Sequence, residues 1–177
     1  MSARMSRSGV ESVGIFRICS SIRKARIPSV LMTIMFAVQV HAADLPAPSI
    51  TPGAIDPSVT QENIQTTICV KGYTRTVRPP ASYTNRLKKW QIREYGYADT
   101  NPRHYEEDHL IPLEIGGNPG DPENLWPEPR RSQWNAKEKD RLENLLHREV
   151  CDGEIPLKTA QAEIAHDWIS ADRKYIH

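Results

Sequence analysis

The sequence predicts a small α+β fold, in which a two-stranded hairpin lies against one helix and further helices flank that core. Residues 105–129 read as strand, turn and strand, bounded by Gly, Pro and Asn. From residue 135 the apolar residues instead recur every three or four positions, the period of a helix. Further helical patterns at 83–95 and 157–168 supply the flanking helices.

The N-terminal residues have the composition of an export signal. Basic residues at positions 23–26 precede a 14-residue apolar run at 27–40, and Val-His-Ala at 40–42 places small residues at the first and third positions before a cut. The run is shorter than the ~20 residues that a membrane-spanning helix needs. We therefore expect residues 1–42 to be a signal peptide and the protein to be secreted or periplasmic. An ordinary amphipathic or anchor helix is the alternative.

The net charge and the positions of the charged residues limit the kinds of partner that are expected. The chain has 23 Lys+Arg and 22 Asp+Glu, of which residues 1–42 hold six and one, so residues 43–177 carry 17 basic and 21 acidic groups, a net charge of −4. This argues against uniform adhesion to nucleic acid. Residues 71–93, however, hold seven basic residues and no acidic one, and the next stretch, 94–108, is acidic. A basic wall beside an acidic pocket is compatible with phosphodiester chemistry.

Two cysteines, Cys69 and Cys151, follow the leader. An even pair in an exported chain predicts a disulfide. Two buried thiols are the alternative.

Taken in order, residues 43–60 contain four prolines and predict an extended, uncommitted linker. Residues 65–73 predict an edge strand, and Pro79 and Pro80 a loop. The helix at 83–95 is expected to have Thr84 as its cap and to bury Leu87, Trp90 and Ile92. Its basic residues predict either a phosphate-contacting face or a solvated one: Arg86, Lys88, Lys89 and Arg93.

The hairpin carries the candidate chemistry. Asp108 and His109 open an apolar run at 110–115, Gly116 and Gly117 end it, and residues 118–121 read as a turn. The return strand is expected at 124–126, with prolines 127 and 129 ending it. Because neighbours on a regular strand point to opposite faces, Asp108 and His109 can share a site only where the strand is irregular.

The central helix is expected to pack on the hairpin through Leu142, Leu145, Leu146 and Val150. Asn135 lies two turns before Leu142 on the same face and has two interpretations. It is either a ligand that points at the hairpin or the N-cap of the helix, with Glu138 completing a capping box. Lys139 and Glu143 flank that face and offer substitutes, Lys139 for a phosphate and Glu143 for a cation.

Three phrases, DHLIPLEIGG, NLWP and the polar helix start, resemble the HNH endonuclease family, the ββα-metal nucleases. The flanking phrases TICVKGY, RLENLLHREVC and AQAEIAHDW are similar to those of small secreted bacterial HNH-type proteins. The resemblance implies an HNH-type nuclease domain at 61–177, built on a hairpin and a helix that clasp one divalent cation. By position it implies His109 as general base, Asp108 and Asn135 as metal ligands, and Asn124 as the asparagine that braces the hairpin. The paired CxxC knuckles of many HNH proteins are absent from the sequence.

The chemistry fits these residue types. A neutral imidazole takes a proton from water, and hard oxygen ligands suit Mg²⁺, with Mn²⁺ or Zn²⁺ as alternatives. Nucleic acid is the expected partner, DNA before RNA, with Arg86, Lys88, Lys89 and Lys139 as contacts. Two other hypotheses remain: a secreted binding module without catalysis on the same scaffold, and a zinc hydrolase built from His104, Asp108 and His109. Acyl transfer is disfavoured, because no G-x-S-x-G motif is present.

Overall fold

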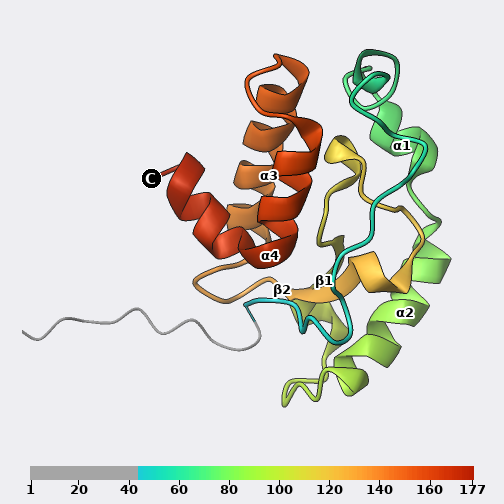
Figure 1. The fold of residues 1–177 in the computed structure, drawn as a ribbon. Coiled ribbons are helices and arrows are strands. Elements are labelled where there is room, and N and C mark those ends of the chain that lie inside the picture. The colour runs from blue at the N-terminus through green and yellow to red at the C-terminus, as the bar shows by residue number, and fades with distance from the viewer. Residues whose placement is uncertain (1–43) are drawn as a thin grey trace, which may run out of the picture. The chain divides into compact units, whose positions relative to one another are not determined.

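The computed structural model describes residues 44–177, and the signal peptide expected at 1–42 lies outside them. An α+β architecture is confirmed: helices surround one two-stranded antiparallel sheet (Figure 1). The helices are α1 (Tyr73–Val77), α2 (Ala81–Glu94), α3 (Ala136–Cys151) and α4 (Leu157–Tyr175), and the strands are β1 (Tyr105–His109) and β2 (Leu125–Pro129). No helix in this part of the chain is both long and apolar enough to cross a bilayer.

The hairpin exists, but its strands differ from the expected ones. β1 ends at His109, where the apolar run was expected to begin, and pairs with β2 from Tyr105↔Pro129 to His109↔Leu125. The run itself is a buried loop with a short 3-10 turn at Leu113–Ile115. The loop is tightly closed, because a Cβ on Gly117 would lie 1.7 Å from the carbonyl oxygen of Ile111.

Prolines 127 and 129 lie within β2 rather than beyond it. A proline donates no backbone hydrogen bond, so it is tolerated where a strand has a partner on one side only. Both strands of a two-stranded sheet are such edges. The expected end of the return strand was therefore wrong, because the sequence does not show that the sheet has only two strands.

α2 begins at Ala81, after Pro80, and Thr84 is not its cap. Trp90, expected to be buried, is 55% exposed, whereas Gln91 and Ile92 are buried. The side-chain amide of Gln91 donates a 2.7 Å hydrogen bond to the carbonyl of Leu125. This bond docks α2 on β2 through a face about 100° round the helix from Trp90.

α3 buries Leu142, Leu146 and Val150 as its period predicted. Its main partner is α4, which lies beside it (Figure 1), and the loop before β2 adds a smaller contact. The last helix extends beyond the expected 157–168, with one break at Asp167 (φ −164°, ψ 93°). The carboxylate of Asp167 accepts hydrogen bonds from the backbone N–H groups of Ile169 and Ser170 and so caps the second half of α4.

Residues 44–60 are not the loose linker that their prolines predicted. The Thr51 hydroxyl donates to the carbonyl of Leu125 (3.1 Å), and Trp168 of α4 donates its indole N–H to the carbonyl of Asp44 (3.0 Å). Ile55 also forms an antiparallel bridge with Gly117. The segment is therefore tied to β2, to α4 and to the hairpin loop.

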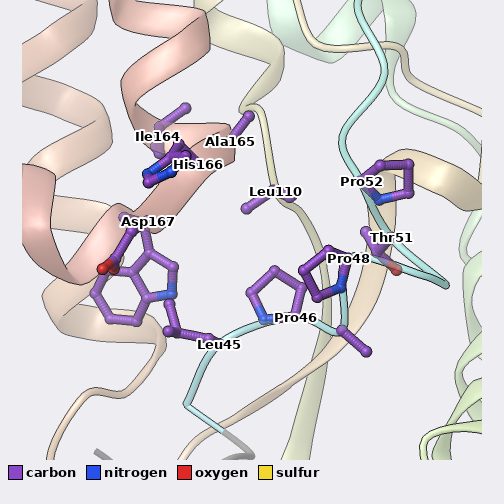
Figure 2. A pocket seen from close by; sticks show the side chains of 12 residues that line it. Leu45, Pro46, Pro48, Thr51, Pro52, Leu110, Ile164, Ala165, His166 and Asp167 are labelled. Carbon is purple, nitrogen blue, oxygen red and sulfur yellow. The ribbon is translucent and has the colours of Figure 1, made fainter.

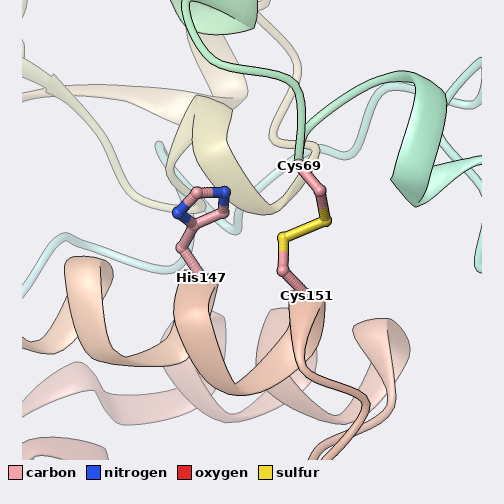
Figure 3. A group of neighbouring side chains, drawn as sticks. All are labelled: Cys69, His147 and Cys151. Atoms are coloured by element: carbon pink, nitrogen blue, oxygen red, sulfur yellow. A yellow bond between two sulfur atoms is a disulfide. The ribbon is translucent and has the colours of Figure 1, made fainter.

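The edge strand expected at 65–73 is absent from the described chain, which has a 3-10 turn at Ile64–Thr66 and then α1. Cys69, in the connection between them, forms a disulfide with Cys151 at the end of α3 (Figure 3). The predicted pairing is confirmed, and it closes a loop of 82 residues.

Candidate active site

Asp108 and His109 line one cavity at the end of β1. The cavity measures about 50 Å³, room for an ion or a few water molecules. Two neighbouring residues can line the same cavity only where the strand is irregular. Here the irregular point is the end of the strand, because His109 is the last residue of β1. The remaining lining residues come from α1, the hairpin loop and α3: Thr74, Arg78, Pro112, Leu113, Glu114 and Glu143.

His109 is held in a form suited to accept a proton. The side chain is 3% exposed, and its Nε2 lies 3.0 Å from the carbonyl oxygen of Pro119. A carbonyl only accepts, so Nε2 carries the hydrogen and Nδ1 of the neutral ring does not. Burial lowers the pKa of His109, against the opposing effect of Asp108. The ring is therefore neutral at neutral pH.

A buried lysine occupies the centre of the site. Lys139 is 0% exposed, and its Nζ donates to Asp108 Oδ2 (2.7 Å), to the carbonyl of His109 (2.7 Å) and to Glu143 Oε1. These three bonds use all three N–H groups of the ammonium. The expectation that Lys139 contacts substrate phosphate was therefore wrong: the amphipathic pattern placed the residue at the edge of a face, and packing buried it.

The buried carboxyls outnumber this single cation. Burial opposes ionisation of Asp108, but Lys139 and His109 together lower its pKa. Burial raises the pKa of Glu143 to about 8, beyond what Lys139 offsets, and raises that of Glu128, which is 1% exposed, well above its usual value. Asp108 is thus the ionised partner of Lys139. Glu143 stays protonated up to about pH 8, and Glu128 stays protonated well above the pKa of an exposed glutamate. A divalent cation bound by Asp108 and Glu143 would therefore displace the proton of Glu143.

Asn135 is the N-cap of α3. Its Oδ1 accepts from the backbone N–H of Lys137 (3.0 Å), and its Nδ2 donates to the carbonyl of Ser132 (2.9 Å). It does not line the cavity that holds Asp108 and His109. Of the two interpretations of Asn135, the structure shows the cap, and the oxygen that α3 directs into the cavity belongs to Glu143.

Asn124 braces the loop between the strands. It is fully buried, and its carboxamide oxygen accepts from the N–H of Ile111 (3.0 Å) and of Ala54 (3.4 Å). Its Nδ2 donates to the carbonyls of Ile111 and Asn118 (3.0 Å each). Asn124 therefore positions the loop that follows His109, and it supports the site without lining it.

The basic residues of α2 lie outside the cavity. Arg86 and Lys89 are exposed, and Lys88 is half-buried, with its Nζ 3.5 Å from the carbonyl of Tyr105. The basic residue that does line the cavity is Arg78, next to Thr74. The sequence analysis did not predict Thr74 and Arg78 as site residues, because only the tertiary position of α1 brings them to His109.

His104 does not join Asp108 and His109, so the zinc-hydrolase arrangement is wrong. Its Nδ1 lies 2.5 Å from Asp99 Oδ2, before β1 begins. Among residues 44–177, one group of three has ligand atoms all within 4.8 Å: Cys69, His147 and Cys151 (Figure 3). Its sulfurs are bonded to each other, whereas the thiolate is the form that binds metals.

A larger cavity lies elsewhere in the described part of the chain. It measures about 580 Å³ and lies between the proline-rich N-terminal segment and α4 (Figure 2). Its walls are mainly apolar, including Pro46, Pro48, Leu110 and Ile164. Size alone does not identify a catalytic site: the larger cavity is lined by the exposed His166, whereas the smaller one holds the buried His109 beside Asp108 and Glu143.

A scan of family models, and searches of curated proteins and of solved structures, found nothing that matches this chain.

Proposed function

We propose that this protein is an exported, metal-dependent nuclease of the HNH type, which hydrolyses phosphodiester bonds in nucleic acid. One observation supports this above all: a neutral His109 with an unprotonated Nδ1 shares a cavity with the carboxyls of Asp108 and Glu143. The disulfide supports export, because such bonds persist in oxidising compartments.

The donor set fits a hard divalent cation. Lys139 binds one oxygen of Asp108 and one of Glu143, so each carboxylate has a second oxygen to offer. Two carboxylates, completed by water and substrate phosphate, are a usual protein contribution to a Mg²⁺ or Mn²⁺ site. When bound, the cation would neutralise charge that develops on the phosphoryl and leaving oxygens. Glu143 thereby takes the role that the sequence had offered to Asn135.

The chain's own residues supply the rest. Nδ1 of His109 accepts the proton of the attacking water, while the Pro119 carbonyl keeps the ring oriented through Nε2. Arg78, in the cavity wall, is placed to pair with a phosphoryl oxygen. Lys139 holds Asp108 and the backbone of His109 in one arrangement, because a single ammonium bonds both.

The test is cleavage of plasmid DNA and of an RNA transcript by wild type, His109→Ala and a control, His166→Ala, whose side chain is exposed on α4. We expect Mg²⁺ or Mn²⁺ to support cleavage, EDTA to stop it, and His109→Ala to lose about 100-fold or more. Circular dichroism and thermal melting check that the variants are folded. Full activity in folded His109→Ala, or in EDTA, would contradict the proposal.

A binding module without catalysis is the second candidate, and Lys139 favours it. The ammonium already lies between Asp108 and Glu143, as a metal ion would. Calorimetric titration with Mg²⁺ and Mn²⁺ separates the two. No cation binding, together with no cleavage, would favour the module.

A further inference from the structure

A second pocket lies between α2 and the open end of the hairpin, away from the end of β1 where His109 lies. It measures about 410 Å³, and four of its seven lining residues are basic while none is acidic. The lining residues are Asn85, Lys88, Lys89, Pro102, Arg103, Tyr105 and Arg130.

Three separate segments supply these cations. The strand register pairs Tyr105 with Pro129, so Arg103 before β1 and Arg130 after β2 emerge at the same end of the hairpin. The backbone N–H of Arg130 donates to the carbonyl of His104 (2.9 Å), which fixes the two flanks together. α2 packs on both strands and adds Lys88 and Lys89.

Much of this positive charge is not neutralised by the protein. Arg130 pairs with Glu106 (2.9 Å), and both side chains remain about half exposed. Within residues 44–177, Lys89 and Arg103 have no ion-pair partner. In a chain whose residues 43–177 carry a net charge of −4, a pocket in which two of the four cations have no ion-pair partner indicates an anionic ligand.

An exposed tryptophan, Trp90, lies on α2 beside the helix face that lines the pocket. We call the line of side chains formed by Arg86, Trp90 and Arg93 the Trp90 row. Trp90 is 55% exposed, whereas Trp126, Trp134 and Trp168 are 9% exposed or less. Two exposed arginines share its face of the helix, Arg86 four residues before it and Arg93 three residues after it, together with one exposed acidic residue, Glu94. The next row of the helix holds Asn85 and Lys89, which line the pocket. Aromatic platforms flanked by cations bind unpaired bases and their phosphates.

We propose that this pocket and the Trp90 row form a binding surface for single-stranded nucleic acid. Phosphates occupy the pocket, and a base stacks on Trp90, which a base held in a duplex cannot do. His109 is four residues along β1 from Tyr105, ~13 Å at ~3.3 Å per residue, so a strand of a few nucleotides spans both sites. The inference rests on the proposed function for one point, that the substrate is a nucleic acid. It does not depend on catalysis, because binding is measured without cleavage.

The test is fluorescence anisotropy of a labelled oligothymidylate of about 16 nucleotides, titrated with the protein in EDTA over a series of NaCl concentrations. The test variants are Trp90→Ala and the double variant Lys89→Gln with Arg103→Gln. The matched control is Lys71→Gln with Lys158→Gln, which removes two exposed lysines elsewhere. Thermal melting of each variant checks the fold.

We expect Trp90→Ala to weaken binding about tenfold. The pocket variant should weaken binding and lower the slope of log K against log[NaCl] by about 1.4, since each lost phosphate contact on a single strand removes ~0.7. Both double variants lose two positive charges. The control should therefore change the affinity and the salt slope only by the small amount that this loss of net charge causes. The matching duplex should bind more weakly than the single strand.

Equal losses in the pocket variant and the control would overturn the inference, as would tighter binding of the duplex. Binding of heparin without binding of the oligonucleotide would also overturn it and would assign the surface to sulfated glycans. Failure of the proposed nuclease activity is separate. It appears as no cleavage, or as cleavage that depends neither on His109 nor on metal, while these binding differences persist.

Discussion

Replacing Lys139 by methionine tests the charge arrangement at the centre of the site. Methionine is similar in length, so the change removes the ammonium with little loss of packing. Asp108 and Glu143 then lose their shared partner, and the carbonyl of His109 loses its donor. Breaking a buried ion pair by removing one partner costs about 3–5 kcal/mol. We therefore expect the free energy of unfolding to fall by about 4 kcal/mol.

Urea unfolding measures this loss. At a slope of about 2 kcal/mol per molar urea, the midpoint should fall by about 2 M with the slope unchanged. Lys158→Met, on the exposed face of α4, is the control and should change the free energy of unfolding by less than about 0.5 kcal/mol.

Two further results follow from the same reasoning. Adding Asp108→Asn to Lys139→Met should restore part of the stability, because no unpaired carboxylate then needs burial at that position. The deficit of Lys139→Met should also shrink at low pH, since without the lysine burial raises the pKa of Asp108 and its protonated form is favoured in the fold. A loss below about 1 kcal/mol at neutral pH would refute the arrangement, since it would show that the lysine does not neutralise a buried carboxylate.

Three other predictions concern the supports of the site. Asn124→Ala removes four hydrogen bonds of the hairpin loop and should cost about 3 kcal/mol in urea unfolding, whereas exposed Asn144→Ala should cost less than about 1 kcal/mol; equal losses would contradict the bracing role. Replacing Cys69 and Cys151 by serine opens an 82-residue loop and should cost about 4 kcal/mol in the same assay, and an unchanged midpoint would argue against the staple. Burial raises the pKa of Glu143 from its ordinary value of 4.5 to about 8, so its contribution to stability is full below about pH 4.5 and is lost as pH rises to about 8. Thermal melts should therefore show a larger fall in Tm from pH 5 to pH 8 for the wild type than for Glu143→Gln, and saturating Mg²⁺ should reduce the fall in the wild type; an equal fall in both proteins would be inconsistent with a protonated Glu143.

Local patterns predicted the parts of this fold that depend on nearby residues. The apolar period placed α3 and buried Leu142 and Leu146, because a helix presents every third or fourth residue to one side. The even cysteine count predicted the disulfide. The adjacency of Asp108 and His109 was sufficient to bring them to one cavity once the strand ended there.

Periodicity identifies a face but not what covers it, and this explains the errors. Trp90 lies on the apolar stripe that the pattern of α2 suggested, yet Gln91 makes the bond to β2 and Trp90 faces outward. The apolar run at 110–115 is buried as its composition requires, but as a loop that Asn124 and Gly117 hold closed. The prolines of 44–60 predicted a free segment, because their contacts with β2 and α4 are far away in sequence.

The residue pattern was thus enough to predict a hairpin, a central helix and flanking helices, to favour a disulfide between Cys69 and Cys151, and to bring an imidazole next to a carboxylate. It left two interpretations of Asn135 open, and the structure shows that Asn135 serves as the N-cap of α3. Two features follow only from contacts between distant segments: Lys139 is buried between Asp108 and Glu143, and Arg78 reaches the cavity. The difference is one of distance along the chain. Dihedral preferences and the hydrogen bonds inside one helix or turn involve residues close in sequence, whereas burial, charge pairing and the long-range hydrogen bonds depend on which distant segments pack together.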